Sequence, residues 1–310
     1  MEHKFRFGIQ TSQADSAGEW AAKAKRIEEL GYSTLLIPDH FNEQFAPVPA
    51  LMAAADATST LRLGTMVLDN DYRHPLVLAK EVATLDILSG GRVELGLGAG
   101  WMRTDYEQSG IPYDRPGVRI RRLREGIQVI KGMFADGPFS FSGEFYDITD
   151  HDALPKPVQK PHPPILVGGG GKRVLSVAAR EADIVGVAVS APEGEINPVA
   201  IATGTAEATR EKVGWIREAA GERLDAIEMT VTVFVCMVTD DREAMAERVA
   251  GGFGFGPEEV KATPHVLIGS VDQIAEDLEQ RRDEFGFSYV VLSGDVFEAM
   301  APVVRRLVGT

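Results

Sequence analysis

Several polar or glycine-rich clusters follow apolar runs of strand length, and their residue types could do chemistry. The first cluster is Pro38-Asp39-His40-Phe41. An imidazole titrates near neutral pH, so His40 is a candidate general acid or base. The alternative is a structural histidine whose ring nitrogens only satisfy neighbouring polar groups. The pattern leaves both readings open and favours the chemical one.

Four consecutive glycines followed by two cations form a second cluster. Its members are Gly168, Gly169, Gly170, Gly171, Lys172 and Arg173. Without side chains, the backbone N–H groups of such a turn can approach an anion closely, and the following helix would add its positive end. The pattern favours a phosphate site over a merely flexible turn. It is not a Walker loop, because Lys172 is followed by Arg and the glycine spacing differs.

A third cluster, Gly96-Leu-Gly98-Ala-Gly100-Trp101, partly matches a dinucleotide-binding fingerprint. Trp101 stands where the third glycine should be, so we reject that interpretation. Glycines at these positions instead suit a floor on which a flat ring can stack closely.

Metal and nucleophile chemistry find little support in the sequence. The histidines at 40, 74, 151 and 162 fall on different expected elements without metal-ligand spacing, so we expect no metal site. No G-x-S-x-G motif occurs, and Cys236 lies inside an apolar strand, where a small core residue is expected. A phosphate-bearing redox cofactor is then the simplest source of chemistry.

Eight short apolar runs must position these clusters. They span residues 5–10, 34–38, 61–67, 93–98, 165–168, 183–187, 227–235 and 289–292. Runs without polar alternation suit parallel strands buried on both faces, and segments of helical period lie between them. Eight strand–helix units predict an α/β fold, the (β/α)8 TIM barrel, whose chemistry lies at the carboxyl ends of its strands. The rival doubly wound sheet would need a glycine loop after the first strand, which residues 11–16 lack.

We expect a single barrel domain over residues 1–310, with insertions near 135–164 and 188–206. Both segments are too long and too rich in loop-forming residues for ordinary connections; the first holds five prolines between 155 and 164. Each could be a lid or substrate wall, or simply an insertion without function.

Composition limits the partners. The formal net charge is −14, which argues against nucleic acid as a partner. The sequence has one cysteine, no apolar run of membrane length and no apolar core in its first residues, so we expect a cytoplasmic protein that does not contact membranes.

In order and spacing these motifs resemble the luciferase-like monooxygenase superfamily, specifically its coenzyme F420 (deazaflavin)-dependent oxidoreductase branch. The matching pieces are residues 38–41, 62–67, 92–101, 119–125, 157–161, 164–171 and 178–183, with Gly269-Ser270 at the expected entry of the last helix. The resemblance covers nearly the whole chain, from Phe7 to about Leu292. It implies a luciferase-like TIM barrel, usually a homodimer, that binds a flavin-type ring at the strand ends.

The resemblance also implies site roles. His40 would be the catalytic proton donor or base, and Met66-Val67 would form a cis-peptide bulge against the ring. Residues expected to bind the cofactor are Asp39, Thr65, Met66, Val67, Asp69, Ala99, Gly100, Thr104, Gly168, Gly169, Gly170, Gly171 and Lys172. The cofactor would be coenzyme F420, an 8-hydroxy-5-deazaflavin, with FMN as the alternative.

Two departures concern the substrate. Sugar-phosphate dehydrogenases of this branch carry an acid where this chain has Trp101, and a Trp where it has Gln44. Phe41, Gln44 and Trp101 would therefore line a pocket for a flat or apolar organic molecule rather than glucose 6-phosphate.

The sequence thus predicts an oxidoreductase that transfers a hydride between coenzyme F420 and a small organic substrate. One rival is an FMN-dependent luciferase-like monooxygenase. A second, of another class, is a non-catalytic barrel that only binds a phosphorylated cofactor.

Overall fold

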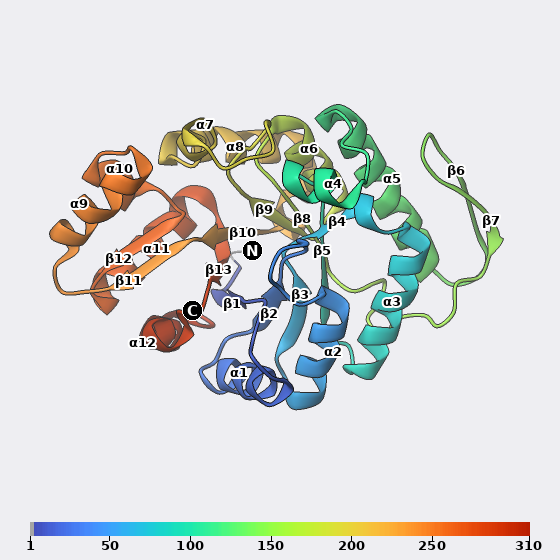
Figure 1. Ribbon diagram of the computed structural model, residues 1–310, viewed down its shortest axis with the longest axis horizontal. Helices are drawn as coiled ribbons and strands as arrows, with labels where there is room; N and C mark the ends of the chain where they lie inside the picture. Colours follow the sequence, from blue (N-terminus) through green and yellow to red (C-terminus); the bar gives the residue numbers. More distant parts are fainter. Residues whose placement is uncertain (1–2) are drawn as a thin grey trace.

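Eight parallel strands close on themselves at the centre of the molecule (Figure 1). The computed structural model describes residues 3–310, so Met1 and Glu2, which the predicted domain includes, lie outside the described residues. The barrel strands are β1 (Arg6–Gln10), β2 (Thr34–Ile37), β3 (Arg62–Thr65), β5 (Val93–Gly98), β8 (Ile165–Gly169), β9 (Ile184–Val187), β10 (Glu228–Val233) and β13 (Phe287–Ser293).

The strands are arranged as a closed ring. Neighbours follow the order β3-β2-β1-β13-β10-β9-β8-β5, and β3 pairs with β5 to complete it. A two-residue strand, β4 (Leu68–Asp69), adds to the edge of β5 just beyond β3. The predicted (β/α)8 barrel is confirmed, and each of the eight predicted runs overlaps a barrel strand.

Helices surround the barrel (Figure 1). They are α1 (Ala17–Glu29), α2 (Pro47–Ala57), α3 (Pro75–Leu88), α4 (Arg103–Ser109), α5 (Pro116–Phe134), α6 (Lys172–Glu181), α8 (Ala206–Ala220), α11 (Val271–Phe285) and α12 (Phe297–Leu307), with short 3-10 turns at Asn70–Tyr72 and Gly221–Ala226. Local sequence sets their ends: Ser16 caps α1, and Ser270 with Gln273 forms a capping box on α11. Among the described helices none is long and apolar enough to span a membrane.

The amino-terminal end of the barrel interior is filled by paired charges. Glu94 accepts hydrogen bonds from Arg6 (2.6 Å) and Arg62 (2.5 Å), and Arg6 also pairs with Glu228. The two guanidinium groups keep the pKa of the buried Glu94 carboxyl below its ordinary value, although burial opposes them. Above this layer a small apolar cluster plugs the barrel; it comprises Leu36, Leu166, Ile184, Tyr289 and Val291.

Three connecting segments leave the regular pattern. Segment 135–164 holds a hairpin of β6 (Phe139–Ser142) and β7 (Asp147–His151), and segment 188–206 holds α7 (Pro198–Ala202). A third is not among the expected insertions: β10 stops at Val233, and β11 (Val235–Val238), α9 (Arg242–Phe253), α10 (Pro257–Ala262) and β12 (Val266–Gly269) follow. The predicted strand 227–235 is therefore too long. Residues 233–238 are all apolar, so the sequence does not show the break at Phe234.

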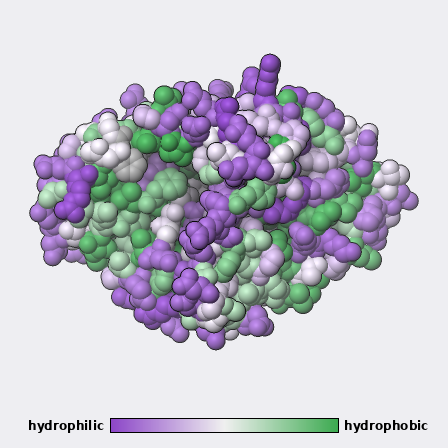
Figure 2. Space-filling view, viewed as in Figure 1, coloured by the Kyte–Doolittle hydropathy of each residue, from purple (hydrophilic) through white to green (hydrophobic). Residues whose placement is uncertain are grey.

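The third segment forms a lobe at the side of the barrel, on the left in Figure 1. β11 and β12 pair with each other in parallel, apart from the barrel sheet. Figure 2 shows hydrophobic surface over this lobe, where Phe234, Met237 and Val238 are exposed.

The close contact between Gly96 and the backbone of Thr65 inside the barrel leads to a prediction about stability. A Cβ added at Gly96 would lie 1.9 Å from the backbone oxygen of Thr65, whose hydroxyl also exchanges hydrogen bonds with the Gly96 backbone. Gly96→Ala should therefore lower the free energy of unfolding by about 3 kcal/mol or more, measured by urea denaturation. Gly214→Ala on α8, where a Cβ meets open space, is the matched control. Equal effects of the two variants would refute the steric argument.

Candidate active site

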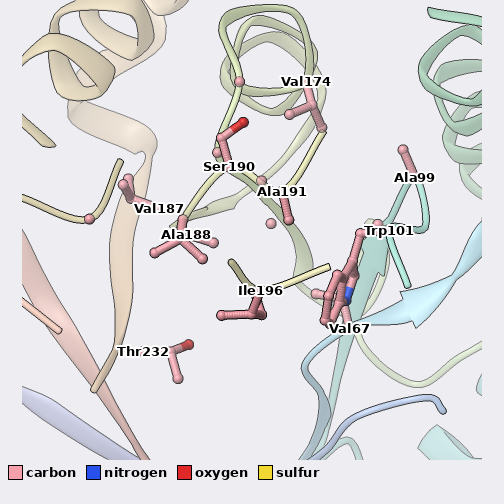
Figure 3. Close-up of a pocket in the computed structure, with 18 of the residues that line it drawn as sticks. Val67, Ala99, Trp101, Val174, Val187, Ala188, Ser190, Ala191, Ile196 and Thr232 are labelled. Atoms are coloured by element: carbon pink, nitrogen blue, oxygen red, sulfur yellow. The ribbon is translucent and has the colours of Figure 1, made fainter. Parts of the chain in front are cut away.

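A cavity of about 780 Å3 opens at the carboxyl ends of the barrel strands. Its walls come from Gln10 at the end of β1, from the loops after β2, β3, β5 and β8, from segment 188–206 and from the third segment. Figure 3 shows Trp101 and Val67 on one side of it, Thr232 on the other and Ile196 between them. Clefts of this kind in TIM barrels are the usual place for ligands.

His40 faces this cavity and is held by a carboxylate. Its Nδ1 lies 2.7 Å from Oδ2 of Asp105, which is buried on α4. The same oxygen accepts a hydrogen bond from the hydroxyl of Tyr72 (3.3 Å). An ionised carboxylate can only accept, so Nδ1 carries a proton and Nε2 is left to exchange a proton with a ligand.

Asp39 also lines the cavity but already has partners for both oxygens. Arg73 donates to Oδ2 (2.5 Å) and Oδ1 (3.0 Å), and the backbone N–H of Asp69 donates to Oδ2 (3.1 Å). These bonds tie the end of β2 to the loop after β3. Arg73 is thereby engaged by Asp39 rather than left for a ligand.

The loop after β3 lies against the glycines of neighbouring strands. The Met66–Val67 peptide bond is cis, as the resemblance implies, and Gln10 donates a hydrogen bond to the Met66 carbonyl (3.0 Å). A Cβ at Gly98 would come within 2.6 Å of Val67, and one at Gly168 within 3.4 Å of it. Val67 can occupy the top of the barrel because Gly98 lacks a side chain, whereas a Cβ at Gly168 would only touch it.

The loop after β5 requires a glycine at position 100 for two reasons. Gly100 has φ of +71°, a left-handed conformation, and an added Cβ would collide with the Tyr106 hydroxyl. That hydroxyl donates to Asp69 (2.8 Å) and Asp71 (3.1 Å). Gly100, Asp69 and Tyr106 thus form one packed unit below the cavity.

The amino terminus of α6 faces the cavity without a capping side chain. Gly171 is the N-cap residue, and a Cβ there would meet nothing within 4 Å. Gly170 is required by packing, because a Cβ would lie 2.4 Å from the backbone oxygen of Val189. Lys172 and Arg173 line the same end, although Lys172 also contacts Glu218 (3.3 Å). Such a helix end with nearby cations is suited to a phosphate.

These features fit a flat ring that carries a phosphate. The apolar slot between Val67 and the glycines of β5 and β8 matches a ring, and the open space at Gly171 matches an anion. Met66, Val67 and Gly168 would contact the ring, and Gly171, Lys172 and Arg173 the phosphate. Within residues 3–310 no group of three or more His, Cys, Asp or Glu side chains could hold a metal ion.

Most of the predicted site residues meet at this cavity. Those that line it are His40, Asp39, Met66, Val67, Asp69, Ala99, Gly100, Trp101, Gly168, Gly169, Gly170, Gly171 and Lys172. Thr65, Thr104, Phe41 and Gln44 are not among the lining residues. Thr65 is buried behind the wall, Thr104 is exposed on α4, and Phe41 stacks on Tyr72 at 4.6 Å. Gln44 bonds the Pro38 carbonyl.

Sequence reasoning missed the residues that support His40. Asp105 and Tyr72 are distant from it along the chain, and nothing in their local sequence marks them. It also missed the far end of the cavity, where Phe234 and His265 stand. Arg119 is a further omission: it lines the cavity, is buried and lies 4.3 Å over the Tyr113 ring. Arg119 opens the matching piece 119–125, but that resemblance did not mark it as a site residue.

Burial raises the pKa of Asp69 from its ordinary 3.8 to about 6, and the nearby carboxylates of Asp71 and Asp39 raise it further. The hydrogen bonds that Asp69 accepts from the Asp71 backbone N–H and the Tyr106 hydroxyl act in the opposite direction. A raised carboxyl pKa means that the folded state binds the proton more tightly, so stability is lost as pH rises through about 6. The free energy of unfolding of the wild type, relative to Asp69→Asn, should therefore fall by roughly 2 kcal/mol between pH 4 and pH 7. Denaturant titrations across this range measure it, and a constant difference would contradict the assignment.

Similar proteins include both reductases and monooxygenases. The 5,10-methylenetetrahydromethanopterin reductase of Methanopyrus kandleri is 28% identical over 316 residues, covering 95% of this chain and 84% of that protein. The FMNH(2)-dependent dimethylsulfone monooxygenase of Pseudomonas putida is 30% identical over 261 residues. That match covers 80% of this chain and 66% of the monooxygenase, slightly less than two thirds of its length.

Solved structures share the fold. The coenzyme F420-dependent tetrahydromethanopterin reductase from Methanopyrus kandleri superposes with a TM-score of 0.79 at 22% identity, over 99% of both chains. A long-chain alkane monooxygenase superposes with a TM-score of 0.78 at 15% identity, over 99% of this chain and 92% of its own. The model of the luciferase-like monooxygenase family matches residues 3–284, so this chain belongs to that family.

Proposed function

We propose that this protein is an oxidoreductase that transfers a hydride between coenzyme F420 and a small organic substrate. The observation that carries the proposal is the His40–Asp105 pair, which faces the same cavity as the uncapped amino terminus of α6. An oriented proton-transfer group and a phosphate cradle in one cavity are what such a reaction needs.

The chain's own residues would bind, orient and exchange a proton. When bound, F420 supplies a ring carbon that accepts or gives up a hydride. Val67 and the facing glycines would fix the ring, and Trp101, edge-on to His40 at 5.7 Å, would help to exclude water. Nε2 of His40 would take a proton from, or give one to, the substrate atom next to the carbon that exchanges the hydride.

An FMN-dependent monooxygenase is the second candidate. It is favoured by the similarity to the dimethylsulfone monooxygenase over 80% of this chain. The slot and the phosphate cradle would also accept FMN. The reductase match extends over 95% of this chain, and the solved tetrahydromethanopterin reductase from the same organism is described as coenzyme F420-dependent, which supports the deazaflavin reading.

A non-catalytic cofactor-binding barrel is the third candidate. Such a barrel would have no use for an imidazole whose tautomer is set by a buried carboxylate, so the Asp105 contact speaks against it.

The implied homodimer and the cytoplasmic location remain predictions. Val77 and Leu88, both exposed on α3, offer apolar surface for a second copy.

Cofactor titration tests the proposal. Oxidised F420 and FMN are each titrated into the full-length chain with fluorescence as the readout, and F420 should bind at least about tenfold more tightly, a difference of about 1.4 kcal/mol. Gly171→Asp should lower the affinity for either cofactor by about tenfold or more, because its carboxylate would repel the phosphate. The same side chain is a good helix N-cap, so folding should not suffer. Gly214→Asp, in open space on α8, is the control.

Tighter binding of FMN would favour the monooxygenase. Unchanged affinity in Gly171→Asp would place the phosphate elsewhere.

Turnover tests the roles of His40 and Asp105. With F420 bound and its absorbance followed across a substrate panel, His40→Ala should reduce kcat by about 10²–10⁴-fold while the cofactor Kd stays constant. Asp105→Asn should reduce kcat by about 10²–10³-fold, because an amide can hold the wrong tautomer. His151→Ala, exposed on β7, is the matched control. Undiminished turnover in His40→Ala would sink the assignment of His40, and cofactor binding without turnover of any substrate would favour the non-catalytic barrel.

A further inference from the structure

The far end of the cavity has a different character from the end at α6. We call this part the annex; it lies between segment 188–206 and the third segment. Its apolar walls are Ile196, Ile201, Phe234, Phe255 and Val260. No Asp, Glu, Lys or Arg is among the residues that line the annex, whereas Lys172 and Arg173 line the α6 end.

One buried polar atom of the annex stands out, because Nε2 of His265 has no hydrogen-bond partner among the described residues. Thr263, in contrast, already donates to the Gly204 carbonyl (2.6 Å). A buried polar atom without a hydrogen-bond partner lowers the stability of the fold. Its presence in a cavity wall therefore indicates a ligand that supplies the missing hydrogen bond.

The geometry of His265 defines what kind of partner it needs. Nδ1 lies 2.8 Å from the Thr232 carbonyl, which can only accept, so Nδ1 carries the proton. Within residues 3–310 the ring forms no ion pair with a carboxylate. Burial, with Lys212 and Arg281 nearby, lowers the pKa of His265 to about 4, so the imidazole is neutral at pH 7. Nε2 is therefore a bare hydrogen-bond acceptor.

Gly204 keeps the far edge of the imidazole uncrowded, because a side chain there would press against it. A Cβ at Gly204 would lie 3.2 Å from Cδ2 of His265, next to Nε2. The Phe234 ring stacks on the imidazole at 5.7 Å and fixes its plane. The acceptor thus has a set position in a wall that is otherwise apolar.

We propose that the annex binds the body of an uncharged, largely apolar substrate, with a hydroxyl or N–H group that donates a hydrogen bond to Nε2 of His265. This inference rests on the proposed oxidoreductase function only for calling the ligand a substrate. An anionic substrate would meet no cation on the annex walls, because Lys212 and Arg281 do not line the cavity and donate to backbone carbonyls. It would also lose its hydration there. The bonding group would be remote from the reacting carbon, so His265 would set specificity and His40 would exchange the proton.

Binding of three naphthalene probes tests this. 1-Naphthol has an apolar body and one donor, 1-methoxynaphthalene lacks the donor, and 1-naphthoate is an anion. Isothermal titration of the full-length chain should show 1-naphthol bound about tenfold more tightly than 1-methoxynaphthalene, and 1-naphthoate weakest. In His265→Leu the preference for 1-naphthol should disappear, whereas His151→Leu should keep it.

A second variant guards against misfolding of His265→Leu. Ile196 is 53% exposed, so Ile196→Lys should fold, and it places a cation at the annex. It should raise the affinity for 1-naphthoate relative to 1-naphthol by about tenfold. If neither variant changes the probe preferences, the probes bind outside the annex and the proposal is overturned.

The titrations are made without cofactor and repeated with the tighter-binding one. A chain that binds neither F420 nor FMN, yet keeps the His265-dependent preference, would disprove the oxidoreductase proposal and leave the annex as a binding site. The reverse result would disprove the annex alone.

Discussion

The whole site depends on keeping side chains out of the upper barrel. An eight-stranded barrel has an interior just wide enough for its own side chains, so a ligand slot requires that inward positions be emptied. Gly98, Gly168 and Gly186 do this on three successive strands, β5, β8 and β9. Gly96 has a second effect, because its missing side chain lets the backbone of Thr65 lie directly against β5. This contact brings the loop after β3 over the mouth of the barrel.

Emptying one end is tolerable because the other end is densely filled. The apolar plug around Leu36 and Tyr289 lies directly beneath, and Glu94 with its two arginines closes the bottom. A buried carboxylate is stable only with such partners, and here they come from β1 and β3. The strands that leave room at the top are therefore held in register from below.

The sequence was most informative where one strand or one turn decides the structure. Strands buried on both faces read as apolar runs, so the eight barrel strands could be predicted, and His40 stood out because it follows one of them. Asp105 could not be found, since its role arises from α4 packing against the end of β2, a contact between residues 65 positions apart. The break at Phe234 was hidden for a related reason: the apolar residues run on from the end of β10 through β11, and only the pairing of β11 with β12 separates the two strands.

Because the net charge is −14, an anionic ligand group can bind only where local donors or cations outweigh the repulsion from the rest of the protein. Lys172 is partly neutralised by Glu218 at 3.3 Å, and Arg73 is engaged by Asp39, so neither offers its full charge to a ligand. For binding an anion, hydrogen-bond donors that point at it then matter more than total charge. The first N–H groups of α6 are such donors, and Gly171 leaves open space in front of them. In the proposed function, a phosphate held there would leave the ring beside Val67 and the rest of the cavity, including the uncharged annex, to a second molecule. One end of the cavity would then favour an anion and the other would disfavour it, so the two proposed ligands could not exchange places.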